Sequence, residues 1–273
     1  MKLTKLKAAL AALLTITGVT FAQGTGTGNA KGDEIMSIVR DFKKPDYTTS
    51  NVYMTLTDKS GKSEKRAVKE YGREVNGNTT IVMMFLSPAS VKDTRFLMEE
   101  KDNGPDDKFI YLPSLKSTRR VNASEGSKSF MGTDATYDDL SSRDFEEDYH
   151  EYIATEDITV GSTVYKNCDV IIETPKDKKS SQYNYRKVWV YHVDEAAKIY
   201  YPVYTELYDK NNRLLKKLSV SKIEKHGDFY IPMDDKMENV QTGHTTFIEI
   251  VNIDTTTAIP DRVFTQNFLN TGK

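Results

Sequence analysis

Residues 109–140, FIYLPSLKSTRRVNASEGSKSFMGTDATYDDL, decide the fold because they join a strand-like aromatic run to a long polar segment. Residues 114–128 are too polar and too rich in glycine and serine to bury their own side chains. Phe130 and Met131 nevertheless stand side by side a little further on. Long loops without secondary structure are usually lids, binding loops or disordered segments. We therefore predict that residues 114–136 form a lid whose apolar latch is Phe130 with Met131.

Alternation of apolar and polar residues runs through most of the chain and is typical of β-strands. Val52, Met54 and Leu56 mark one such run, and Asn76-Gly77 is a strong hairpin signal. The expected strands lie near residues 47–58, 65–75, 79–86, 94–100, 108–112, 149–153, 162–174, 183–193, 199–208, 214–225, 229–239 and 241–253. So many strands with few helices predict a mainly β protein, an incomplete antiparallel β-barrel.

The expected helical segments are few and short. Asp33 is suited to cap a helix whose apolar residues recur at helical spacing, namely Ile35, Ile38, Val39 and Phe42. Ser87-Pro88 suggests a single helical turn, and Thr136 suggests the cap of another. Because the first helix has one apolar face, we expect it to lie across the concave face of the sheet, with the short helices beside it.

The N-terminus has the pattern of a secretory signal peptide, residues 1–22. Three lysines precede an apolar run at residues 8–19, and Ala22 is a small residue at the expected cleavage site. The apolar run has about 12 residues, whereas a membrane-spanning helix needs about 20. We therefore expect an exported protein in the periplasm that is not anchored by this segment.

Residues 23–273 are expected to form one domain, because no proline- or glycine-rich linker interrupts them. Cys168 is the single cysteine, which forbids an internal disulfide and leaves no lipid-accepting cysteine near the cleavage site. The formal net charge is −2, with acidic and basic residues interspersed. This charge distribution argues against nucleic-acid binding, which requires a basic face.

Several motifs resemble the outer-membrane lipoprotein-sorting family, periplasmic carriers with a LolA-like fold. The first two are Y-L-P-x-L-x-x-x-R-R from Tyr111 and S-F-M-G-T-D-x-T-Y-D-D-L from Ser129. A third is F-L-S-P-A-S-V-K-D-T-R-F-L at residues 85–97, where Asp93 replaces the glycine usual in the family. Residues 259–264 resemble the closing segment of these carriers, and weaker similarity extends over about residues 35–269.

The resemblance implies a carrier that binds acyl chains in an apolar cavity and sorts lipoproteins to the outer membrane. An inner-membrane transporter and an outer-membrane acceptor would then be its partners, and a monomer is expected. The residues expected to line the cavity are Val52, Met54, Leu56, Ile81, Met83, Phe85, Met98, Phe109, Tyr111 and Trp189. Three alternatives stay open: ordinary core packing of these residues, an accessory of a membrane lipid exporter, and a structural envelope protein that binds nothing.

Arg119 and Arg120 stand beside the predicted lid and are candidates for contact with a lipid headgroup or an acidic partner. An equally simple explanation is that both arginines lie in a loop exposed to solvent and bind nothing. The four histidines are scattered without the spacing of a zinc site. The sequence also lacks a G-x-S-x-G nucleophile motif, so we expect no catalytic residues, metal or cofactor.

Overall fold

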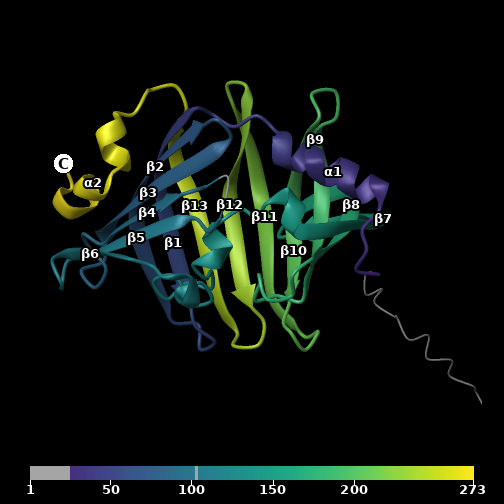
Figure 1. The fold of residues 1–273 in the computed structure, drawn as a ribbon, viewed down its shortest axis with the longest axis horizontal. Coiled ribbons are helices and arrows are strands. Elements are labelled where there is room, and N and C mark those ends of the chain that lie inside the picture. Colours follow the sequence, from purple (N-terminus) through teal and green to yellow (C-terminus); the bar gives the residue numbers. More distant parts are fainter. Residues whose placement is uncertain (1–24, 102–103) are drawn as a thin grey trace, which may run out of the picture.

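The computed structural model describes residues 25–101 and 104–273, and the predicted signal peptide lies outside these residues. Figure 1 shows a large, curved antiparallel sheet accompanied by two helices and short 3-10 turns. The strands are β1 (Tyr47–Thr57), β2 (Ser63–Val75), β3 (Asn78–Ser87), β4 (Arg95–Glu99), β5 (Asp107–Leu112), β6 (Ser117–Arg120), β7 (Asp148–Val160), β8 (Thr163–Pro175), β9 (Tyr185–Asp194), β10 (Ile199–Tyr208), β11 (Leu214–His226), β12 (Phe229–Asn239) and β13 (His244–Asp254). The helical elements are α1 (Ala30–Asp41), η1 (Ala123–Glu125), η2 (Asp138–Leu140), η3 (Phe145–Glu147), η4 (Asp261–Phe264) and α2 (Gln266–Thr271).

The strand order brings the first and last strands of the chain together in the middle of the sheet. The order is β6-β5-β4-β3-β2-β1-β13-β12-β11-β10-β9-β8-β7. β6 and β7 therefore stand at opposite edges, and the sheet does not close on itself. The prediction of a mainly β, incomplete antiparallel barrel is confirmed.

Local turn chemistry explains where the strands begin and end. Asn76 and Gly77 both have positive φ, 54° and 86°, which is the geometry of a two-residue hairpin turn. The predicted hairpin between β2 and β3 is therefore confirmed.

The expectation that residues 114–136 contain no strand is wrong, because β6 pairs with β5 there. An edge strand needs only one partner, and its polar side chains suit an exposed edge.

The two faces of the sheet are covered by different parts of the chain. We call the face that carries Met54 the inner face and the opposite one the outer face. Directly opposed residues of antiparallel strands point to the same face. One such row crosses the sheet through Leu56, Thr246, Met237, Leu218, Thr205 and Val188. Because Ile35 and Met36 of α1 pack against Val188, α1 lies on the inner face, as predicted (Figure 1).

The C-terminal segment covers the outer face. Val263 and Phe264 of η4 pack with Phe268 and Leu269 of α2 against the strands β3 and β4. Side chains alternate along a strand, so neighbouring residues of β3 and β4 contribute to the inner and outer faces in turn. This segment seals one side of the sheet, as the resemblance implied.

Of two local expectations about helix starts, one is wrong and one is confirmed. The side chain of Asn29, and not Asp33, caps α1, because its Oδ1 accepts a hydrogen bond from the amide of Gly32 at 2.9 Å. Ser87 ends β3, and the amides of Val91 and Lys92 both donate to the carbonyl of Pro88, at 3.1 and 2.9 Å, which closes the single helical turn predicted here.

We predict that Gly32→Ala destabilises the protein by about 1 to 3 kcal/mol, the usual cost of overpacking a filled site. A Cβ atom at this position would overlap the carbonyl of His150 on β7, so α1 would have to move away from the sheet. Chemical denaturation followed by circular dichroism measures the change. Glu34→Ala, on the exposed side of the same helix, is the control, and equal stability of the two variants would contradict the docking of α1.

Candidate functional site

An apolar cluster fills the inner face on the side of β1 to β5. The predicted cavity residues in it are Val52, Met54, Leu56, Met83, Phe85 and Met98, and Ile81 packs against it. Side chains from the segments that connect the strands complete the cluster, namely Val91, Val121, Phe130 and Tyr137. The structure thus brings seven of the ten predicted residues to one place, and whether they line a binding cavity stays a prediction.

The other three predicted residues lie elsewhere. Phe109 and Tyr111 point to the outer face, where they pack against the C-terminal segment, because Ile110 between them takes the inner position. Trp189 lies opposite Tyr204 on the outer face, in a cluster around β8 to β10. In strands buried on both faces, composition does not indicate which face a residue occupies.

The segment between β6 and β7 lies over the inner-face cluster, and we call residues 121–140 the cover. Phe130 is its central contact, with only 1% of its surface exposed. Its ring centroid lies 4.9 Å from that of Phe96, 6.1 Å from that of Phe85 and 5.7 Å from that of Tyr137. Met131 is half-buried at the edge of the same cluster. The apolar pair predicted to be a latch therefore faces the sheet.

Arg66 of β2 holds the cover beside this aromatic contact. Its guanidinium donates a hydrogen bond to the carbonyl of Met131 at 2.5 Å and pairs with Glu64 at 2.7 Å. Only 7% of Arg66 is exposed, although arginine is rarely buried. The carbonyl is presented by a bend in which Met131 and Gly132 have φ of 52° and 80°. The sequence alone leaves open whether Arg66 or Arg73 holds the predicted lid, because nothing local marks which loop each side chain reaches.

A second polar contact joins the cover to β13. The amide of Asp134 donates to the hydroxyl of Thr246 at 2.9 Å, and that hydroxyl donates to the Asp134 carboxylate at 2.8 Å. Nδ1 of His244 lies 2.8 Å from the same carboxylate oxygen. Asp134 and Thr246 are both buried, so these hydrogen bonds replace water that neither group can reach.

A third contact fixes the end of the cover to β11 and to the β8–β9 connection. The ammonium of Lys216 lies 2.8 Å from the carboxylate of Asp139, and each side chain is about 95% buried. The hydroxyl of Tyr183 donates to the same carboxylate at 2.8 Å. Burial and the charge of Asp139 raise the pKa of Tyr183, which keeps its phenol protonated as a donor. Gln182 donates to Thr136 at 2.7 Å and completes the network.

Arg119 and Arg120 are exposed on β6, directly before the start of the cover. Arg119 pairs with Glu125 at 2.9 Å, and Arg120 pairs with Asp107 at 2.5 Å. Both ion pairs are on the surface, where water screens them. Their predicted contact with a headgroup or partner stays a prediction.

Two acidic side chains share the inner face with the apolar cluster. Glu70 follows Val68 on β2 by two residues, and Asp235 is paired in register with Ile248, which packs against the cluster. Desolvation raises the pKa of Glu70 to about 7, and desolvation with the nearby charge of Asp234 raises the pKa of Asp235 to about 7. Among the described residues neither carboxylate has a cation within ion-pairing distance. The inner face can therefore carry less negative charge near neutral pH than its composition suggests.

Other site classes have little support in the part of the chain that the structure describes. Within residues 25–101 and 104–273, histidine, cysteine, aspartate and glutamate do not gather in threes where a metal ion could sit. The helices in these same ranges are too short or too polar to cross a membrane.

Comparison with known proteins places this arrangement in a family. A family model described as an uncharacterized protein matches residues 77–271. A solved outer membrane lipoprotein-sorting protein domain from Vibrio parahaemolyticus is 27% identical, with a TM-score of 0.77 over 88% of this chain and 98% of that one. The chain belongs to a LolA-like family. Sequence analysis reached the same family from the motifs in the cover and in residues 85–97.

Two further structures resemble this LolA-like protein in fold. A DUF1329 family protein from Desulfovibrio piger has a TM-score of 0.77 and 24% identity over 88% of this chain and 98% of that one. A LolA superfamily protein from Nitrosomonas europaea has a TM-score of 0.62 and 16% identity over 87% and 98% of the two chains. No curated protein sequence matches the chain significantly.

We predict that Lys216→Met lowers the free energy of unfolding of this LolA-like protein by about 3 kcal/mol, because it leaves the buried Asp139 without its cation. Urea denaturation measures the change. The control is Lys217→Met at the neighbouring position, which points to the other face and should change stability by about 0.5 kcal/mol at most. Equal effects of the two substitutions would show that the third contact of the cover contributes nothing specific.

We predict that stability falls as the pH rises from about 4 to 7. Glu70 and Asp235 have raised pKa values when folded, so the native protein holds protons that the unfolded chain has already released. Their stabilising contribution is complete below the unfolded pKa values and is lost as the pH rises through about 7. We expect a loss on the order of 2 kcal/mol for the pair, discounted because both side chains are half-buried.

Urea denaturation at pH 4.5, 6 and 7.5 tests this dependence. Glu70→Gln combined with Asp235→Asn should remove the fall between these pH values and stabilise the protein at pH 7.5. The control combines Glu195→Gln with Asp228→Asn, two exposed turn positions, and should keep the wild-type profile. A double variant at positions 70 and 235 with the wild-type slope would refute the assignment.

Proposed function

We propose that this protein is a periplasmic carrier that shields acyl chains on its inner face and sorts lipoproteins to the outer membrane. The observation that carries the proposal is the cover, a polar segment that places Phe130 and Met131 on an apolar cluster. The 27% identity to a lipoprotein-sorting domain, over nearly its whole length, supports the same function. In this proposal, residues 23–273 act as one monomeric domain between an inner-membrane transporter and an outer-membrane acceptor.

The mechanism follows from the contacts of the cover. Moving Phe130 and Met131 off the cluster exposes apolar surface worth about 3 to 5 kcal/mol. An entering acyl chain gains about 0.8 kcal/mol for each methylene that it buries, so about four to six methylenes offset this loss. The exposed cluster residues, among them Met54, Met83 and Met98, have flexible side chains that adapt to chains of different shape. The cover thus makes binding reversible.

The polar contacts decide how readily the cover moves. Arg66, Thr246 and Lys216 hold it at three separate strands, and each contact must break before the inner face opens. The net contribution to stability of a hydrogen bond to a charged group is about 1.5 to 3 kcal/mol. Loss of one contact should therefore speed ligand exchange without unfolding the sheet.

We predict that Arg66→Met releases a bound fluorescent fatty acid about tenfold faster, because the carbonyl of Met131 loses its charged donor. Stopped-flow dissociation from loaded protein measures the rate. Arg73→Met is the control, since Arg73 lies on the same strand and instead pairs with Asp261 of the C-terminal segment. Equal rates in the two variants would contradict the role of Arg66, and absence of saturable binding to folded wild-type protein would contradict the carrier function itself.

A further inference from the structure

The carboxylate of Glu70 lies among buried side chains on the inner face. Val68, which precedes it on this face of β2, is buried in the apolar cluster. Glu70 is paired in register with Met83 of β3 and with Ser50 of β1, and both of these residues are buried. Because directly opposed residues of antiparallel strands point to the same face, the carboxylate of Glu70 stands beside these side chains.

Asp235 of β12 has an equally apolar surrounding. It is paired in register with Ile248 of β13 and with Val220 of β11, and Met237 follows it on the same face. Val220 and Met237 are buried, and Ile248 packs against the apolar cluster. Asp235 is therefore flanked on three sides by groups that form neither ion pairs nor strong hydrogen bonds.

Neither carboxylate has a polar partner in the part of the chain that the structure describes. Arg66, on the same strand and face as Glu70, pairs instead with Glu64 at 2.7 Å. Lys216, on the strand next to that of Asp235, is engaged by the cover. The negative charges of Glu70 and Asp235 are thus not compensated by the cations of these strands.

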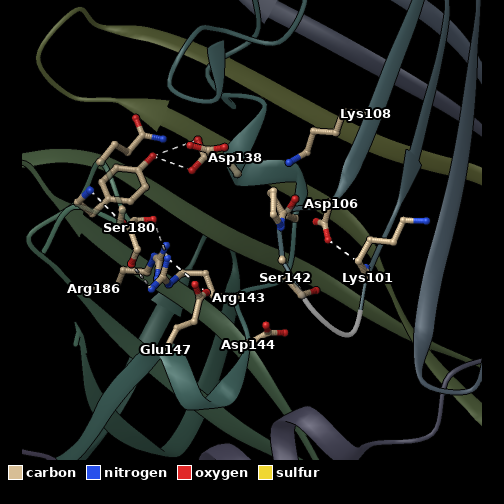
Figure 2. A pocket seen from close by; sticks show the side chains of 17 residues that line it. Lys101, Asp106, Lys108, Asp138, Ser142, Arg143, Asp144, Glu147, Ser180 and Arg186 are labelled. Atoms are coloured by element: carbon tan, nitrogen blue, oxygen red, sulfur yellow. Dashed lines mark hydrogen bonds and ion pairs between the residues drawn. The ribbon is translucent and has the colours of Figure 1, made fainter. Parts of the chain in front are cut away.

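Acidic side chains beyond the end of the cover are arranged differently. In the pocket that the end of the cover helps to line, Figure 2 shows Glu147 next to Arg143, with 3.6 Å between their charged groups. The buried Asp148 binds the same guanidinium at 2.8 Å. These carboxylates stay charged beside a cation, whereas Glu70 and Asp235 have only apolar neighbours and each other.

The curvature of the sheet brings Glu70 and Asp235 toward each other across the inner face. Their strands are separated by β1 and β13. Desolvation is the main cause that raises the pKa of Glu70 to about 7, and the charge of Asp235 adds to it. Asp234, which points to the outer face, adds to desolvation in the same way at Asp235. Both carboxylates therefore change charge near neutral pH.

The other titratable groups near this pair come from different strands. Desolvation raises the pKa of Tyr165 on β8 and of Tyr201 on β10, that of Tyr165 to about 12, and the charge of Asp235 contributes to each shift. Both phenols thus stay uncharged at neutral pH. His244 of β13 is bound to Asp134 of the cover at 2.8 Å, so a test must leave this histidine in place.

A chain bound on the inner face would change the hydration of the two carboxylates. Glu70 and Asp235 are half-buried, so water still reaches them. An acyl chain displaces this water, and an ionised carboxylate without water or a cation is far more costly than a protonated one. Binding therefore favours protonation of the pair. Because linkage is reciprocal, protonation favours binding to the same extent.

We propose that binding of an acyl chain on the inner face is coupled to proton uptake by Glu70 and Asp235, so that the ligand is held at acidic pH and released as the pH rises. This inference rests on the proposed carrier function and adds its regulation. At pH 5.5 both carboxylates are protonated before the ligand arrives, so affinity is highest. At pH 8.5 the ligand must either protonate them or bury their charges, so affinity is lowest.

Isothermal titration with octyl glucoside, below its micelle concentration, tests the coupling at pH 5.5, 7 and 8.5. This probe is uncharged throughout, so a change in affinity belongs to the protein. We expect affinity to fall about tenfold from pH 5.5 to 8.5, which corresponds to a pKa difference of about one unit between free and loaded protein. At pH 7, titrations in phosphate and in Tris should give different heats, because the buffer supplies about one proton on binding.

Glu70→Gln combined with Asp235→Asn should bind octyl glucoside equally at all three pH values, with equal heats in both buffers. Glu195→Gln combined with Asp228→Asn is the control at exposed turn positions and should keep the wild-type dependence. His244 is intact in both variants, and circular dichroism shows that each is folded at the three pH values.

The outcomes separate this inference from the proposed function. Wild-type affinity that is equal at all three pH values, with equal heats in both buffers, would leave the carrier function standing and overturn the coupling. A pH dependence that persists in the variant at positions 70 and 235 would assign it to other groups and also overturn the proposal. If octyl glucoside does not bind the folded wild type at any of these pH values, the carrier function fails and the coupling fails with it.

Discussion

The burial of Phe130 against Phe85 and Phe96 is the contact on which the rest of the arrangement depends. An incomplete barrel leaves one apolar face open, and exposed apolar patches of this kind lead to association. This chain covers the face with a segment that is otherwise polar, anchored through one aromatic side chain. Aromatic pairs contribute about 0.5 to 1.5 kcal/mol to stability beyond the burial of their surface area. These contacts fix the position of Phe130 on the sheet and are weak enough to break.

The polar contacts around this anchor give the cover a defined closed position. They reach β2, β13, β11 and the β8–β9 connection, which belong to both halves of the sheet. Each contact is a hydrogen bond or ion pair between groups that water can satisfy once they separate. The cover is therefore held by interactions that exchange readily with solvent, whereas the strands beneath it are held by backbone ladders. This difference in stability is what a movable segment requires.

Much of the fold follows from the sequence because alternation and turn residues act locally. The runs around Met54 and the Asn76-Gly77 turn are examples, and the isolated Phe130-Met131 pair correctly drew attention to the cover. The pairing of Asp139 with Lys216 could not be predicted, because it joins residues far apart in the chain that no local pattern relates. Phe109 and Tyr111 lie on the outer face, apart from the other predicted cavity residues, because β5 has apolar residues on both sides and its alternation carries no signal. β6 was missed because a short polar strand looks like a loop.

Locking the cover tests the central claim, that it must move for a ligand to bind. Asp134 of the cover and Thr246 of β13 hydrogen-bond to each other, so a disulfide between cysteines at these two positions would hold the cover on the sheet. Burial raises the pKa of the native Cys168 thiol to about 12, which keeps it out of this reaction. Binding of a fluorescent fatty acid is measured before and after reduction of the pair. The account predicts no binding to the oxidised protein and full binding after reduction, and equal binding in both states would contradict it.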